Sequence, residues 1–273
     1  MPSPCPASPI TAFPRGKDWS LFIAAFGLVL VQPGFILIDH GHFQFNSVCL
    51  GLAAAAAGLV NMGREGGIGA WQLVGSALFV MSLCYKQIAL YYAPAFFFFL
   101  LGRSFGEGGG AVKGIANVAL LGVVVVASFA FAFAPWLSLS SPGQVLQVFR
   151  RIFPVGRGLY EDKVANFWCA ASPVLRFKEW VAPDRMVLIS LATTIVAFVP
   201  SGFCALRKPT MRNLLWTMLN TSLSFFLFAY QVLSLNMLCA LHSIVALFSI
   251  PLSVLLSPCD CPHVSACVRF CVN

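Results

Sequence analysis

Charge is scarce in this 273-residue sequence, and the scarcity limits the class of protein. Only 10% of the residues are Asp, Glu, Lys or Arg, 59% are hydrophobic, and the mean hydropathy is +0.86. Soluble domains carry roughly 25% charged residues. The chain therefore lacks the polar side chains that would coat a soluble globule of this size, and we predict an integral membrane protein.

The sequence also lacks the marks of a nucleic-acid-binding protein. Its net charge of +8 comes from basic residues in short connections between apolar runs, and no basic stretch is interleaved with aromatic residues. Cations in such connections are typical of membrane topology signals. We therefore expect membrane lipids, and no nucleic acid, as the surroundings of these cations.

Cysteine is present but forms no recognisable framework. Four of the ten cysteines crowd the last fifteen residues beside His263, without the paired C-x2-C spacing that is typical of zinc sites. We expect no metal and no cofactor, and we regard residues 258–273 as an irregular Cys-rich tail.

Long apolar runs are what the sequence has in abundance. A membrane-spanning helix needs about 20 mostly apolar residues. This criterion selects residues 20–38, 43–62, 70–101, 114–136, 186–206, 213–232 and 236–257. The run 70–101 is too long for a simple crossing and is interrupted by Lys86 and Gln87. We predict two short helices meeting at a turn there, with a single tilted helix as the alternative.

About eight crossings result, and the predicted fold class is an all-α membrane protein, a polytopic transmembrane helix bundle. The expected organisation has five parts. They are a Pro-rich N-terminal segment (1–19), transmembrane helices (20–136), a polar loop with an amphipathic helix (137–185), further transmembrane helices (186–257) and the Cys-rich tail.

Basic residues in the short connections orient the bundle. The turn that holds Arg207, Lys208 and Arg212 is predicted to be cytoplasmic by the positive-inside rule. Counting crossings from it places the loop 137–185 on the opposite side, provided that residues 70–101 cross twice. Asp39 and Lys86 then lie on that same side, so we expect three polar clusters on one non-cytoplasmic face.

The first cluster surrounds a glycine at a membrane boundary: Asp39, His40 and His42, followed by Gln44 and Asn46. An Asp and two His this close can bind a metal or a phosphate, or act as acid and base. If the following segment is helical from its start, Asn46 lies about one turn from His42. A polar turn solvated at the interface is the alternative.

The second cluster is Lys86 with its neighbours Tyr85 and Gln87. A lysine at membrane depth is costly unless it reaches the interface or finds a partner. Snorkelling to the interface is one interpretation, and holding a lipid phosphate is the other.

The third cluster is the loop 137–185. Ser141 and Pro142 are a typical helix start, and apolar residues at helical spacing continue to Pro154, which predicts an amphipathic interfacial helix. This helix either guides a lipid-linked substrate or packs against the bundle. Side chains suited to sugar hydroxyls follow it: Arg157, Glu161, Asp162, Lys163, Asn166 and Trp168. A salt-bridged loop cap is the alternative for them.

These three stretches resemble one family. Residues 39–46, 85–87 and 157–169, in their order and approximate spacing, are similar to the dolichyl-phosphate-glucose-dependent glucosyltransferases of the endoplasmic reticulum. The run from Glu161 to Trp168 is similar to the member that adds the first glucose to the high-mannose lipid-linked oligosaccharide. The resemblance covers roughly residues 19–232.

The resemblance implies a GT-C-like fold in a multi-pass protein of the endoplasmic reticulum membrane, with a lumenal active site. It implies a glycosyltransferase that moves glucose from dolichyl phosphate glucose to the lipid-linked oligosaccharide in N-glycosylation. The reaction inverts the anomeric centre and gives an α-1,3 linkage without a cofactor. Inversion needs one carboxylate general base, and the leaving phosphate needs cationic or hydrogen-bonding stabilisation.

Substrate-binding roles follow from the resemblance. The expected set is Asp39, His40, His42, Gln44, Lys86, Arg157, Glu161, Asp162, Lys163, Asn166 and Trp168. Within it, the carboxylates are expected to bind acceptor or donor, Lys86, Arg157 and Lys163 to hold the donor phosphate, and the two histidines to hydrogen-bond either substrate. No residue is assigned as the general base.

The sequence departs from the family at both ends. In the family, a longer N-terminal half carries the presumed base, and a His-Glu-Lys run follows the position where Leu233, Ser234 and Leu235 stand here. A truncated, non-catalytic membrane fragment of the enzyme is therefore an alternative expectation. A small membrane transporter is a third, although it should place charges midway along its spans, and only Lys86 comes near that.

Overall fold

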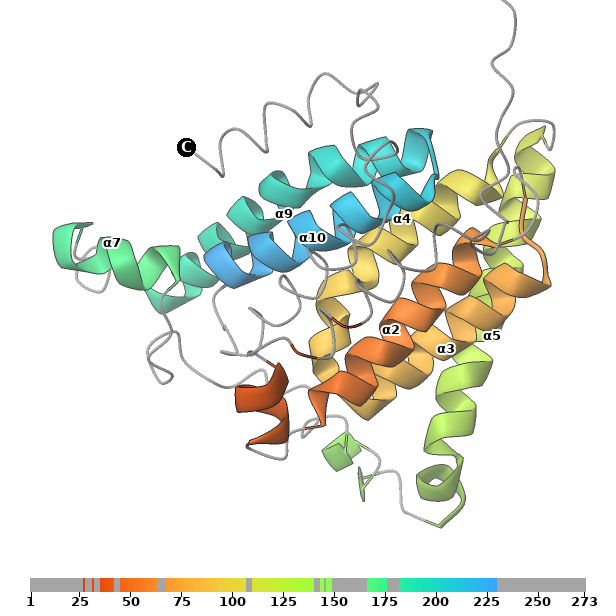
Figure 1. The fold of residues 1–273 in the computed structure, drawn as a ribbon, viewed down its shortest axis with the longest axis horizontal. Coiled ribbons are helices and arrows are strands. Elements are labelled where there is room, and N and C mark those ends of the chain that lie inside the picture. Colours follow the sequence, from red (N-terminus) through yellow and green to blue (C-terminus); the bar gives the residue numbers. More distant parts are fainter. Residues whose placement is uncertain are drawn as a thin grey trace, which may run out of the picture.

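The described part of the chain is helical throughout. A computed structural model describes residues 27, 31, 35–41, 45–62, 67–106, 110–139, 143–144, 146–148, 166–175 and 182–229. The elements in chain order are the π-helical turn η1 (Phe35–His40), α2 (Asn46–Asn61), α3 (Ala70–Tyr85), the 3-10 helix η2 (Gln87–Tyr92), α4 (Ala93–Ser104), α5 (Gly110–Leu139), α7 (Phe167–Leu175), α9 (Pro183–Arg207) and α10 (Met211–Phe228) (Figure 1). Over these residues the prediction of an all-α protein is confirmed.

Two of the described helices are long and apolar enough to cross a membrane. They comprise Gly110–Trp136 of α5 and Arg185–Arg207 of α9, where the sequence predicts spans at residues 114–136 and 186–206. The helices α2 and α3 are apolar but shorter, with 16 residues each. The predicted span 236–257, and most of the one at 20–38, lie outside the described residues.

The apolar run from residue 70 breaks where its lysine lies. The helix α3 ends at Tyr85, and Lys86 is extended, with φ −155° and ψ 135°. The 3-10 helix η2 follows, and α4 then begins with a proline in its first turn, where the missing N–H costs nothing. Two short helices meeting at a turn are thus confirmed, and a single tilted helix is excluded.

The start of α2 differs from the expectation. Phe45 has left-handed backbone angles, with φ 54° and ψ 29°, and the helix begins only at Asn46. Such angles are uncommon for a bulky residue and do not continue a helix. The expectation that one helix carries His42 one turn from Asn46 is therefore wrong.

Only part of the amphipathic helix predicted between residues 142 and 153 can be compared with the structure. Residues 143–144 and 146–148 are helical, and the remainder lies outside the described residues.

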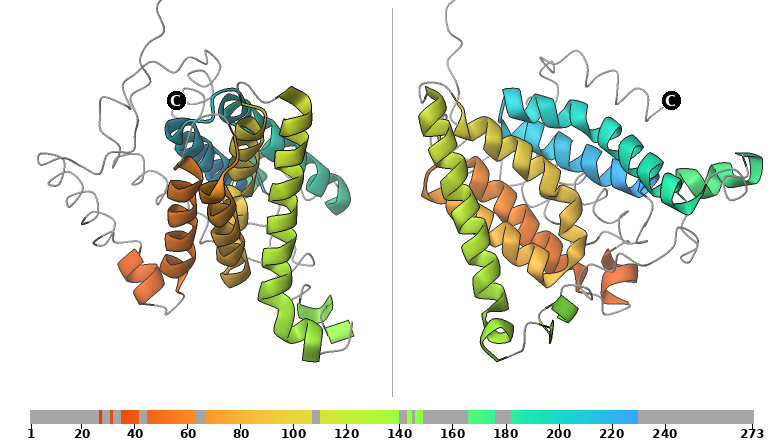
Figure 2. Two further views of the ribbon diagram at one scale, coloured as in Figure 1. Left: turned by 90° about the vertical axis from the view of Figure 1, so that its right-hand side faces the viewer. Right: turned by 180° about the vertical axis from the view of Figure 1, so that it is seen from behind.

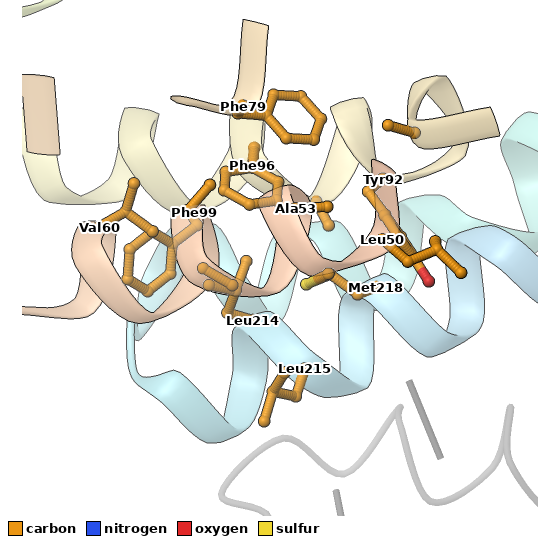
Figure 3. Close-up of a cluster of buried hydrophobic side chains, with 14 of the residues drawn as sticks. Leu50, Ala53, Val60, Phe79, Tyr92, Phe96, Phe99, Leu214, Leu215 and Met218 are labelled. Atoms are coloured by element: carbon orange, nitrogen blue, oxygen red, sulfur yellow. The ribbon is translucent and has the colours of Figure 1, made fainter. Parts of the chain in front are cut away.

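In the described part of the chain, one apolar core joins α2, α3, η2, α4 and α10. Leu50, Tyr92, Phe99 and Leu214 are almost completely buried in it (Figure 3). Dense contact of this kind, rather than exclusion of water, is the main attraction between helices within a bilayer. The core therefore fixes how the helices that carry the polar clusters lie relative to one another.

Small residues bring some of the helix backbones into direct contact. A Cβ atom on Gly102 of α4 would lie 2.3 Å from the carbonyl oxygen of Leu206 in α9. Glycine at such a crossing allows the close approach that is common between membrane helices. The end of α4 is thereby fixed against the end of α9.

The helices pack around this core mainly in pairs. The antiparallel pairs α2–α3 and α9–α10 lie side by side, α4 contacts the second pair, and α5 packs along α3 at one edge (Figure 2). Chain direction alternates from helix to helix, so the start of α2, the break at Lys86 and the end of α10 can meet at one end of the bundle.

Candidate functional site

The carboxylate of Asp39 caps the first turn of α2. Its Oδ1 accepts a hydrogen bond from the backbone N–H of Asn46, and its Oδ2 accepts one from the N–H of Ser47 at 2.8 Å. The side chain is only 2% exposed. A carboxylate here satisfies N–H groups that lack a partner within the helix and faces the positive end of the helix dipole.

The local turn explains how Asp39 reaches this position. Gly41 follows η1, and its N–H donates to the carbonyl oxygen of Ile36 at 3.0 Å. A Cβ atom at Gly41 would lie 2.5 Å from the carbonyl oxygen of Leu37. Glycine fits this tight turn at the end of η1, which contacts α2.

Lys86 occupies the break between α3 and η2. Its N–H donates to the carbonyl oxygen of Ser82 at 3.1 Å, and its own carbonyl oxygen lies 3.4 Å from the Sγ of Cys49 in α2. The hydroxyl of Ser82 donates to the carbonyl oxygen of Cys49 at 2.7 Å. These contacts join the start of α2 to the residue predicted to hold a lipid phosphate.

Asn166 and Trp168 lie against the end of α10. The indole Nε1–H of Trp168 donates to the carbonyl oxygen of Phe228 at 2.8 Å, and the amide of Asn166 donates to that of Ala229 at 3.5 Å. The Oδ1 of Asn166 accepts from the N–H of Cys169 at 2.8 Å, which caps α7. Both side chains are buried, with exposures of 3% and 4%.

The described members of the three clusters meet at one end of the bundle. The 3-10 helix η2, which follows Lys86, contacts both α2 and α10, and α7 contacts α10. The ring of Tyr91 in η2 lies 5.2 Å from that of Phe225 in α10. The cap of α2, the break at Lys86 and the residues bonded to the end of α10 therefore adjoin a common set of helix ends (Figure 1).

The other predicted site residues have no described side chains. His40 is the last residue of η1, and its side chain lies outside the described part. Also outside it are His42, Gln44, Arg157, Glu161, Asp162 and Lys163. Among the side chains that are described, no three His, Cys, Asp or Glu residues gather as a metal ion would require.

Sequence reasoning did not find the partners of the buried polar groups. The bond from Trp168 to Phe228 joins residues 60 positions apart and ends on a backbone carbonyl. No residue type at position 228 is needed to supply that acceptor, so no local pattern indicates it. The cap made by Asp39 has no local signal either, because Asp39 lies seven residues before Asn46 and the N-cap position is Phe45.

Known proteins with similar sequences carry related names. A profile of the ALG6, ALG8 glycosyltransferase family matches residues 11–261. The dolichyl pyrophosphate Man9GlcNAc2 alpha-1,3-glucosyltransferase of Gallus gallus is 42% identical over 204 residues, which are 75% of this chain and 38% of that protein.

Relatives from two other organisms have a similar sequence identity to this chain. The probable dolichyl pyrophosphate Man9GlcNAc2 alpha-1,3-glucosyltransferase of Dictyostelium discoideum is 38% identical over 251 residues, 90% of this chain and 45% of the relative. The dolichyl pyrophosphate Man9GlcNAc2 alpha-1,3-glucosyltransferase of Saccharomyces cerevisiae is 40% identical over 228 residues, 82% of this chain and 40% of the relative. The chain thus spans less than half the length of these relatives.

Proposed function

This chain belongs to the ALG6, ALG8 glycosyltransferase family, and from this membership we propose that it carries one substrate-binding end of an α-1,3-glucosyltransferase. The donor is dolichyl phosphate glucose, and the acceptor is the Man9GlcNAc2 oligosaccharide on dolichyl pyrophosphate. One observation carries the proposal. The described parts of three motifs, each typical of this family, adjoin the same helix ends.

The proposed reaction is a single inverting displacement. A carboxylate base removes the proton from an acceptor hydroxyl, whose oxygen forms a bond to the anomeric carbon of glucose. The bond from that carbon to the phosphate oxygen breaks, and the phosphate leaves with the electron pair. A cation or hydrogen-bond donor at the phosphate stabilises the charge that develops there.

Lys86 is the described residue that we propose for the phosphate. It lies at a helix break, and η2, which follows it, contacts both α2 and α10. We propose donor or acceptor binding for the rest of the predicted set outside the described side chains. They are His40, His42, Gln44, Arg157, Glu161, Asp162 and Lys163.

We further propose a GT-C-like multi-pass arrangement of about eight crossings in the endoplasmic reticulum membrane, with the candidate site on the lumenal side. The distribution of charge supports this orientation. Most of the described cations lie at the other end of the helices: Arg103, Lys113, Arg207, Lys208 and Arg212. Cations gathered at one end of a bundle are typical of its cytoplasmic side.

Substitution of Lys86 tests the proposed role in donor binding. The experiment uses a completed chain, in which this chain replaces the matching region of the Saccharomyces cerevisiae relative. Membranes containing it are supplied with dolichyl phosphate glucose and the Man9GlcNAc2 acceptor. We expect Lys86→Met to raise the KM for the donor by roughly 10- to 100-fold, since a hydrogen bond to a charged group contributes about 1.5–3 kcal/mol.

Two further variants make this test specific. Lys86→Arg should retain most of the donor affinity, because it keeps the positive charge. Lys113→Met removes an exposed lysine at the start of α5, at the other end of the bundle, and should leave the KM unchanged. An identical donor KM in Lys86→Met and Lys113→Met would contradict the phosphate role.

A further inference from the structure

The last turn of α10 connects two parts of the candidate site. On one side, Phe225 contacts Tyr91 of η2 at 5.2 Å between ring centroids. On the other side, the carbonyl oxygens of Phe228 and Ala229 accept hydrogen bonds from Trp168 and Asn166. The segment that follows Lys86 and the segment that holds Trp168 are thus fixed to one helical turn.

The polar atoms of Asn166 and Trp168 are already used in these contacts. Trp168 has one polar atom, its Nε1–H, which is bonded to Phe228 at 2.8 Å. The amide and the oxygen of Asn166 are bonded to Ala229 and to the N–H of Cys169. Because both side chains are nearly fully buried, a sugar would have to displace these bonds before it could reach their polar atoms.

Aromatic packing reinforces the same attachment. The ring of Phe167 lies 5.7 Å from that of Phe228 and 5.1 Å from that of Trp168. The last carbonyl oxygens of a helix receive no hydrogen bond from an N–H of the same helix. A neighbouring segment can therefore donate to them without breaking the helix. The beginning of α7 is therefore attached to the end of α10 by hydrogen bonds and by rings.

We propose that Asn166 and Trp168 are positioning residues, which attach the start of α7 to the turn of α10 that also contacts η2, rather than residues that bind a sugar. This inference rests on the proposed function, because it assigns these two residues a role in the same site.

Kinetics of the completed chain separate positioning from sugar stacking. Trp168→Phe keeps an aromatic face but removes the N–H that binds Phe228. Positioning predicts that Trp168→Phe lowers kcat by about fivefold, the loss expected for one buried hydrogen bond, with unchanged KM values. Stacking predicts instead that Trp168→Phe is nearly normal and that Trp168→Ala raises the KM for a sugar substrate.

Two variants complete the series. Asn166→Ser keeps an oxygen to cap α7 and removes the donor to Ala229, so a smaller fall in kcat is expected because that bond is long, at 3.5 Å. Trp71→Phe changes a tryptophan that is 52% exposed on α3, and it should alter neither kcat nor KM.

Cross-linking tests the attachment without any glucosyl transfer. Cysteines placed by Phe167→Cys and Phe228→Cys should react together with a short bismaleimide, and peptide mass spectrometry should locate the product. We expect the yield to fall when Trp168→Phe is added and to stay the same when Trp71→Phe is added. A yield that is independent of Trp168, or the kinetic pattern of stacking, would overturn the inference. If the completed chain transfers no glucose, the proposed function fails, and the cross-link alone decides whether the attachment exists.

Discussion

Single residues hold the candidate site through bonds to backbone groups at helix ends. Asp39 binds two N–H groups at the start of α2, and Trp168 binds a carbonyl at the end of α10. Asp39 is followed by His40, and Asn166 is preceded by the acidic run, so each motif combines a buried attachment with polar neighbours.

Substitution of Asp39 should therefore reduce stability. Asp39→Ala leaves two N–H groups at the start of α2 without their acceptor and should lower the free energy of unfolding by about 1–2 kcal/mol, the usual effect of losing a helix cap. Asp39→Asn retains one acceptor oxygen and should lose less. Thermal unfolding of the purified protein in detergent measures the difference.

Ser47→Ala is the matched control for this experiment. Ser47 contributes its backbone N–H to the cap, which the substitution keeps, so its unfolding temperature should be unchanged. An unfolding temperature of Asp39→Ala equal to that of the control would contradict the capping role and favour direct substrate contact.

At the scale of elements, the polar contacts of Asn220 join α10 to α9. The amide of Asn220 in α10 donates to the carbonyl oxygen of Ala197 in α9 at 3.0 Å and to the hydroxyl of Ser201 at 2.9 Å. Hydrogen bonds from polar side chains to a neighbouring helix are common in membrane bundles. Asn220 therefore contributes to the pairing of α9 with α10.

Replacement of Asn220 should weaken this helix pair. Asn220→Leu removes both hydrogen bonds, each of which is worth about 0.6 kcal/mol in membrane helices, and should destabilise the protein by about 1 kcal/mol. Asn213→Ala removes only an exposed bond to the carbonyl oxygen of Lys208 and should have a smaller effect. Unfolding in detergent compares the two variants, and equal unfolding temperatures would contradict the role of Asn220.

Several elements could be predicted from the sequence, because the length of an apolar run, and a lysine that interrupts one such run, determine them. The predicted break at Lys86 is correct, and the predicted spans at residues 114–136 and 186–206 correspond to α5 and α9. The predicted start of α2 is too early, because nothing in the sequence indicates that the backbone of Phe45 is left-handed. Bonds between distant segments, such as Trp168 to Phe228, depend on tertiary packing and have no local pattern.

At the scale of the whole molecule, alternating helix direction separates two chemically distinct ends. One end holds the described members of the polar motifs, and the other holds most of the described cations, including Arg207 and Lys208. The prediction that the motifs share one non-cytoplasmic face rests on counting crossings; in the described part of the chain, η2 contacts both α2 and α10. In the function proposed above, the two lipid-linked substrates bind at the first end, with the donor phosphate at Lys86.

Complementation tests the central claim most directly. The completed chain is expressed in cells that lack the first glucosyltransferase of lipid-linked oligosaccharide assembly, beside a control in which the matched region of the Saccharomyces cerevisiae relative is deleted. The lipid-linked oligosaccharides are then released and sized. We predict that the completed chain restores the glucosylated oligosaccharide and that the deletion does not. Accumulation of unglucosylated oligosaccharide with the completed chain, although it is expressed and reaches the membrane, would contradict the assignment of this chain to the substrate-binding end of the enzyme.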